Sequence, residues 1–113
     1  MPSATRFRKG FGLPDIGEKI SGWVVESSEI EHIPIKRYRK YRYPIHYEFE
    51  GSGDISTLKS LFNQSSRIIY TRYGNPYRCS ISLKDIRRED GKVVVEAEGY
   101  CERIFRNSPR AER

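Results

Sequence analysis

Apolar and polar residues alternate most strictly between Tyr41 and Glu50. Every second residue is aromatic or aliphatic: Tyr41, Tyr43, Ile45, Tyr47 and Phe49. The residues between them are polar, charged or proline: Arg42, Pro44, His46, Glu48 and Glu50. This period-2 pattern predicts a strand with one face on the core. Pro44 has no N–H to donate, so we expect the strand to be an edge strand or bulged at that point.

Weaker patterns predict the remaining elements. The segment 19–30 has strand character, 67–72 predicts a short strand, and 77–87 with 93–101 predicts a final hairpin. Asp54 is a good helix N-cap, and apolar residues follow it at helical spacing: Ile55, Leu58, Leu61 and Phe62. The expected fold class is α+β and mainly β. It has about five antiparallel strands as a sandwich or partly open barrel with one short helix, in the order ββαβββ.

The final hairpin allows a prediction of register. The apolar residues of both strands are odd-numbered, so paired residue numbers must sum to an even value for the apolar sets to share a face. A three-residue loop from Glu89 to Gly91 meets this condition, with Gly91 in a left-handed conformation. That register places Arg78 opposite Glu102, Lys84 opposite Glu96 and Cys79 opposite Cys101.

The length of 113 residues suits one domain. Residues 1–17 contain two prolines and three glycines and predict an irregular basic N-terminal arm. We expect a single β-rich domain over residues 18–105, with a basic loop over 31–42, and a basic tail over 106–113. Net charge is +6, and acidic stretches (18–35 and 43–54) alternate with basic ones (36–42 and 55–78).

Five of the seven residues from Lys36 to Arg42 are basic, and tyrosines interrupt the run. Cations bind phosphates and tyrosines stack on bases, so a polyanion is one candidate partner; an acidic subunit interface is the other. The candidate partner-binding residues are Lys36, Arg37, Tyr38, Arg39, Lys40 and Arg42, together with Arg6, Arg8 and Lys9. Arg67, Arg72 and Arg78 extend this set. We expect the loop to protrude as a flexible finger that orders on contact.

Signatures of other classes are weak. No apolar run approaches the ~18 residues of a membrane span, and no signal peptide is visible, so we expect cytoplasmic synthesis and no membrane partner. The two histidines, His32 and His46, lack further ligands at metal-site spacing. His46 beside Glu48 has the geometry of a general-base pair, but a solvated strand histidine is the favoured interpretation. We therefore expect no enzyme activity, catalytic residue, metal or cofactor.

Cys79 and Cys101 are the only cysteines. In the predicted register they face each other, so they either form a cross-strand disulfide or fill the core as two small residues. The second interpretation is favoured, because a reducing compartment keeps thiols free.

Two functions fit these features. The order of elements over residues 18–105 resembles the small tail and connector proteins of tailed bacteriophages, which share a β-sandwich flanked by one helix. This resemblance implies a structural assembly subunit, a homo-oligomer or part of a larger particle such as a virion, whose basic loop and terminal arms contact neighbouring subunits. The alternative is a module that binds single-stranded nucleic acid or RNA through Lys36–Tyr43.

Overall fold

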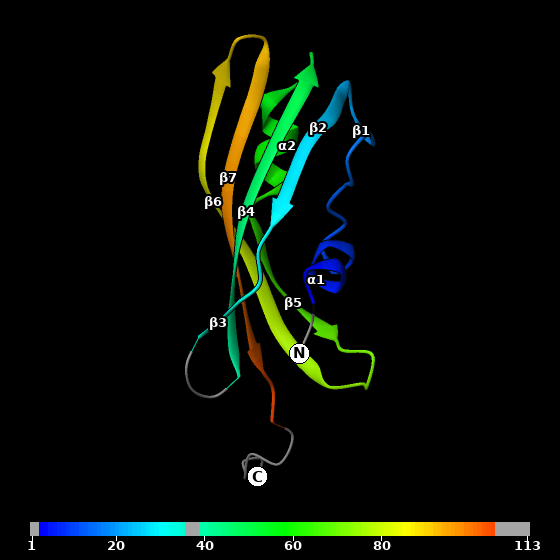
Figure 1. Cartoon of the computed structure of the whole chain (residues 1–113), viewed down its shortest axis with the longest axis vertical. Helices are drawn as coiled ribbons and strands as arrows, with labels where there is room; N and C mark the ends of the chain where they lie inside the picture. The colour runs from blue at the N-terminus through cyan, green and yellow to red at the C-terminus, as the bar shows by residue number, and fades with distance from the viewer. Residues whose placement is uncertain (1–2, 36–38, 106–113) are drawn as a thin grey trace.

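The computed structural model describes residues 3–35 and 39–105 of the chain. Within these residues, two short helices and seven strands follow one another as α1 (Ala4–Gly10), β1 (Lys19–Ile20), β2 (Trp23–Ile30), β3 (Ile33–Ile35), β4 (Lys40–Gly51), α2 (Ile55–Leu61), β5 (Gln64–Tyr70), β6 (Pro76–Glu89) and β7 (Lys92–Arg103). The strands form one long, curled sheet, and both helices lie beside it (Figure 1).

The order across the sheet is β1-β2-β4-β7-β6-β5, with β3 paired to β4 beyond the end of β2. All neighbouring strands are antiparallel, and the curl gives a half-barrel. This confirms the predicted fold class and favours the partly open barrel over the sandwich. The predicted first strand is divided into β1 and β2, and the sequence patterns did not predict α1 or β3.

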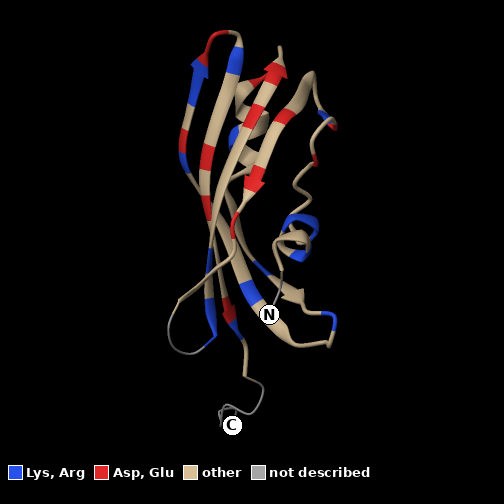
Figure 2. Cartoon of the chain, in the orientation of Figure 1, with Lys and Arg blue, Asp and Glu red and all other residues tan. Residues whose placement is uncertain are grey.

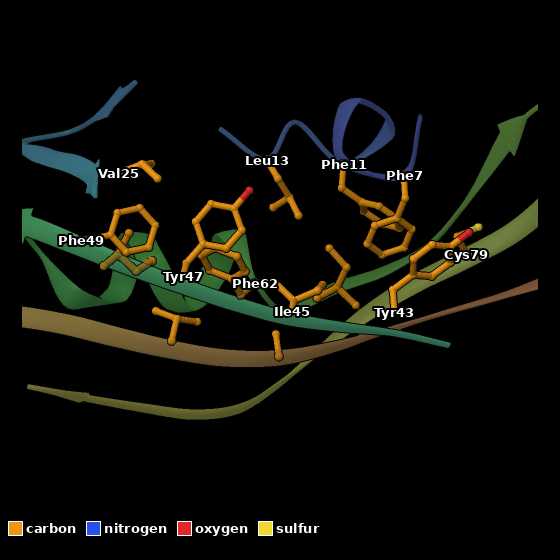
Figure 3. Close-up of a cluster of buried hydrophobic side chains, with 14 of the residues drawn as sticks. Phe7, Phe11, Leu13, Val25, Tyr43, Ile45, Tyr47, Phe49, Phe62 and Cys79 are labelled. Atoms are coloured by element: carbon orange, nitrogen blue, oxygen red, sulfur yellow. The ribbon is translucent and has the colours of Figure 1, made fainter. Parts of the chain in front are cut away.

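The inner face of β4 carries the core (Figure 3). Its alternate residues Tyr43, Ile45, Tyr47 and Phe49 are at most 2% exposed, as their spacing predicts. α2 begins after Asp54, whose carboxylate accepts a hydrogen bond from the Ser56 N–H at 3.0 Å, and this confirms the predicted N-cap. A seven-residue helix is marginal alone, so contact between its buried face and the sheet stabilises it.

The N-terminal segment is helical, and the predicted irregular arm is wrong for residues 4–10. α1 begins after Ser3, whose hydroxyl accepts a hydrogen bond from the Arg6 N–H at 3.3 Å. Phe7, Phe11 and Leu13 are at most 5% exposed and belong to the main core cluster. The core therefore includes side chains that precede residue 18.

An aromatic contact packs α1 against the sheet. The Phe7 ring stacks on the Tyr43 ring, with centroids 4.3 Å apart and planes 11° from parallel (Figure 3). On β7, Gly99 provides the space for this ring, because a Cβ at position 99 would collide with the Phe7 ring. The pairing of Tyr43 with Gly99 across β4 and β7 brings these two residues side by side beneath the helix.

The predicted basic loop over residues 31–42 is largely a hairpin. β3 pairs with residues 40–42 at the start of β4, so Lys40 and Arg42 are strand residues. Residues 36–39 are all that separates β3 from β4, and the first three of them lie outside the described residues. Residues 40–42 of the predicted finger therefore lie within the sheet, between β3 and β7, and residues 36–38 are outside the described part of the chain.

Pro44 is in an interior strand, so its predicted position at an edge is wrong. β4 pairs with β7 on one side and with β2 and β3 on the other. The Pro44 carbonyl accepts a hydrogen bond from the Glu31 N–H at 3.0 Å, in the gap between β2 and β3. The N–H and C=O of a strand residue point the same way, so the missing donor also faces this gap.

The register of β6 and β7 agrees with the prediction near the base of the hairpin. Arg78 lies opposite Glu102 and Cys79 opposite Cys101. The register then shifts by one residue after Leu83, so Asp85 rather than Lys84 faces Glu96. Lys84 instead approaches Glu98, with Nζ and Oε1 3.8 Å apart.

This shift explains why the predicted three-residue loop is wrong. The hairpin closes with a two-residue turn, Asp90-Gly91, whose φ angles of 48° and 78° are the positive values of a type I′ turn. Such a turn alone would put the two apolar faces out of phase. The β-bulge at position 84 supplies the extra residue that restores the phase in the lower half of the hairpin.

The two cysteines form a disulfide, so the favoured expectation of free thiols is corrected. Cys79 and Cys101 are at most 1% exposed and their Cα atoms are 4.1 Å apart. The bond joins β6 to β7 below the bulge and fixes the half of the hairpin that agrees with the predicted register.

We expect Gly99→Ala to destabilise the fold by about 1–3 kcal/mol, because the added methyl group displaces the Phe7 ring. Phe7→Ala should cost about 3–5 kcal/mol, because it removes a fully buried ring. Thr5→Ala on the exposed side of α1 is the control. Urea unfolding measures all three, and a neutral Gly99→Ala variant would contradict the proposed docking of α1.

The double variant Cys79→Ala/Cys101→Ala should lose about 2–4 kcal/mol of stability, because a cross-link over 22 residues restricts the unfolded chain. Wild-type protein in reductant should match this variant in urea unfolding. Detection of two free thiols in the purified, non-reduced protein would show that the bond does not form.

Candidate functional site

The structure separates the residues of the predicted basic run. Lys36, Arg37 and Tyr38 lie outside the described residues, and Arg39 is exposed with a positive φ of 54°. Lys40 lies opposite Glu102 in the ladder. Arg42 donates to Glu98, with Nη1 and Oε2 2.9 Å apart. The strand part of the run is therefore partly neutralised by carboxylates of this chain.

Arg8, another predicted partner-binding residue, holds the N-terminal segment to the fold. Its guanidinium donates to the Ser28 hydroxyl at 2.9 Å and to the Tyr47 hydroxyl at 3.3 Å. It also forms an ion pair with Asp15 at 2.9 Å. With its donors engaged by three groups of the same chain, Arg8 is a structural residue.

Arg6 and Lys9 lie on the other side of α1, where they line a groove between α1 and β5. This basic groove has a volume of about 750 Å³ and includes one further predicted cation, Arg72. Arg6 donates to the Tyr70 carbonyl at 3.0 Å. The described lining residues thus include three cations and no carboxylate. The other described residues that line the groove are neutral: Ser3, Thr5, Gly10, Ile68, Ile69 and Tyr70.

Exposed apolar side chains accompany these cations. Ile68 is 44% exposed and Tyr70 is 56% exposed, both on β5. Tyr73 follows in the β5–β6 connection at 77% exposure, and the Arg72 guanidinium lies over its ring, 5.1 Å from the centroid. Large exposed aromatic residues beside charges are typical of binding surfaces rather than of ordinary solvated strands.

A second groove of opposite charge lies on the outer face of β2, β4 and β7. This acidic groove has a volume of about 350 Å³ and is lined by Glu29, Glu31, Pro44, Ile45, His46, Glu96 and Ala97. Glu29 and Glu31 are exposed and form no ion pair with any described residue. Among the described residues, this groove is thus lined by three carboxylates and by neither lysine nor arginine.

His46 is a bridging residue rather than the solvated histidine that we expected. Its Nδ1 lies 2.7 Å from Glu96 Oε2, and its Nε2 lies 3.0 Å from Glu48 Oε2. Both ring nitrogens can donate only in the imidazolium form. The hydrogen bond to Glu48, together with the bond to Glu96, raises the pKa of His46 above its ordinary value. Since carboxylates engage both nitrogens, the less favoured interpretation of His46 as a general base has no free nitrogen to support it.

The two grooves lie over different strands: the basic groove lies at the β5 edge of the sheet, between β5 and α1, and the acidic groove lies over β2, β4 and β7. α1 covers the inner side, where Phe7 contacts Tyr43, whereas Pro44 and His46 have the opposite parity and face outward. Figure 2 shows Asp and Glu on the upper parts of β2 and β4 and along β7, and it shows Lys and Arg on α1. The two grooves are a property of the fold, because each combines residues distant in the sequence.

The described residues contain no group of three or more histidine, cysteine or acidic side chains arranged to hold a metal ion. His32 stacks on Tyr41, with ring centroids 5.0 Å apart, and burial lowers the pKa of its imidazole. Among the same residues, no helix has the length and apolar character to cross a membrane.

Comparison with known proteins identified no matching family model, no similar curated protein and no similar solved structure.

Substitution of His46 should change how stability depends on pH. Folding raises the pKa of His46 above its unfolded value near 6.5, so the imidazolium form stabilises the fold. This stabilisation is fully present below the unfolded pKa and is lost as the pH rises through the folded pKa. Urea unfolding at about pH 6 and about pH 9 should show His46→Gln destabilised more at the lower pH.

His32→Gln is the matched control, because its lowered pKa gives a dependence of the opposite sign. Equal destabilisation of His46→Gln at both pH values would show that the bridge to the two glutamates contributes nothing through charge.

Proposed function

We propose that the protein is a non-enzymatic structural subunit that assembles with other protein subunits. The observation that carries the proposal is the pair of separate grooves with opposite charge on one sheet. Complementary charge steers association and fixes the register of an interface. The exposed Ile68, Tyr70 and Tyr73 add apolar surface of the kind that interfaces bury.

The proposal places the contact surfaces differently from the sequence prediction. Of the predicted partner-binding residues, Arg6 and Lys9 keep this role in the basic groove. Arg8 and Arg42 are assigned to intrachain contacts instead. A place in a phage virion, as a tail or connector component, rests on the resemblance in element order alone and remains part of the proposal.

Nucleic-acid binding is a second candidate, and a specific observation favours it. Tyr70 lines the basic groove and Tyr73 contacts its Arg72, and these rings are 56% and 77% exposed. Stacking of unpaired bases on such rings, with phosphates on Arg6, Lys9 and Arg72, is the usual arrangement for single-stranded nucleic acid. The acidic groove has no role in this alternative.

The wild-type protein should form oligomers in solution whose average mass rises with concentration. Salt should weaken them, because exposed charges are screened between about 50 mM and about 500 mM ionic strength. Sedimentation velocity measures both effects. A monomer at every concentration and salt level would contradict the proposed function, and binding of a labelled single-stranded oligonucleotide by that monomer would support the second candidate.

A further inference from the structure

The two grooves match each other in charge and in character. The basic groove presents Arg6, Lys9 and Arg72, and the acidic groove presents Glu29 and Glu31 beside Glu96, which already contacts His46. Each also has apolar surface at its base or rim: Ile68 and Tyr70 in the first, Pro44 and Ala97 in the second. An interface commonly combines an apolar centre with a charged rim in this way.

The grooves cannot meet within one chain, because they lie over different strands of one sheet, with β6 between β5 and the β7 residues of the acidic groove. We propose that the acidic groove of one copy receives the basic groove of the next copy, so that copies join head to tail. This inference rests on the proposed assembly function and names its partner as a second copy of this chain. Because each contact uses two different surfaces, the assembly is a closed ring or an open filament rather than a two-fold dimer.

The charges that this contact needs are available. Lys9 forms no ion pair with a described residue, and the Arg72 guanidinium contacts the neighbouring Tyr73 ring and hydroxyl. Glu29 and Glu31 likewise have no ion-pair partner among the described residues. If these cations and carboxylates pair between copies, both gain a partner of opposite charge, whereas a nucleic acid would pair with the cations alone. Charge complementarity therefore favours a second copy as the occupant.

Charge reversal on each side tests the contact. Lys9→Glu/Arg72→Glu makes the basic groove acidic, and Glu29→Lys/Glu31→Lys makes the acidic groove basic. All four side chains are exposed, and none of their side chains bonds to the main chain of the fold, so folding should be unchanged. Lys59→Glu, an exposed change on α2 outside both grooves, is the matched control.

Sedimentation velocity should show each double variant alone with at least about tenfold weaker self-association than wild type. An equimolar mixture of the two should regain oligomers, since every reversed groove then meets one of opposite charge. Lys59→Glu should behave as wild type. Circular dichroism and urea unfolding confirm that each variant is folded.

Three outcomes would overturn the inference, and they separate it from the proposed function. If both double variants still form oligomers as the wild type does, the head-to-tail contact is wrong, and the copies assemble through other surfaces. Loss of oligomers in both variants without recovery in the mixture would show that the grooves do not pair with each other. A wild-type monomer that binds single-stranded oligonucleotide, and loses this binding in Lys9→Glu/Arg72→Glu, would overturn both proposals.

Discussion

The packing of the Phe7 ring between Tyr43 and Gly99 is the contact on which the arrangement of this protein depends. α1 has seven residues and would not be stable without tertiary packing. Its position is fixed because Gly99 leaves room for a ring that stacks on Tyr43 at 4.3 Å. The same contact sets α1 beside β5 and so creates the groove that Arg6, Lys9 and Arg72 line. Core packing on one side of the helix thus determines which cations are free on the other.

The sheet organises the acidic surface in a comparable way. Antiparallel pairing of β2, β4 and β7 places Glu29 opposite His46 and His46 opposite Glu96. The alternation that buries Tyr47 necessarily turns His46 and Glu48 outward, where they form the bridge with Glu96. An imidazolium between two carboxylates reduces their mutual repulsion and leaves Glu29 and Glu31 as the charges directed at solvent. The strand pattern that forms the core therefore also forms the second groove.

Local signals in the sequence predicted part of this fold. The alternation from Tyr41 to Phe49, the Asp54 cap and the pairing of Cys79 with Cys101 each depend on neighbouring residues or on one hairpin, and each agrees with the structure. α1 was missed because Phe7 and Phe11 give only one helical repeat, although Ser3 is a suitable N-cap. The bulge at Lys84 was missed because the turn and the apolar phase favour different loop lengths. Neither groove was predictable, since each forms where residues far apart in the sequence meet.

The central claim is that the two grooves contact each other between copies, and zero-length carbodiimide cross-linking of the wild-type protein tests it most directly. The reagent joins an amine to a carboxylate that it already contacts, and a mixture of unlabelled and ¹⁵N-labelled protein distinguishes links between copies from links within one. We expect mixed-isotope products that join Lys9 to Glu29 or Glu31. The account would be contradicted if Lys92–Glu26, an ion pair within the chain at 2.8 Å, were cross-linked efficiently while Lys9 formed no link to either glutamate of another copy.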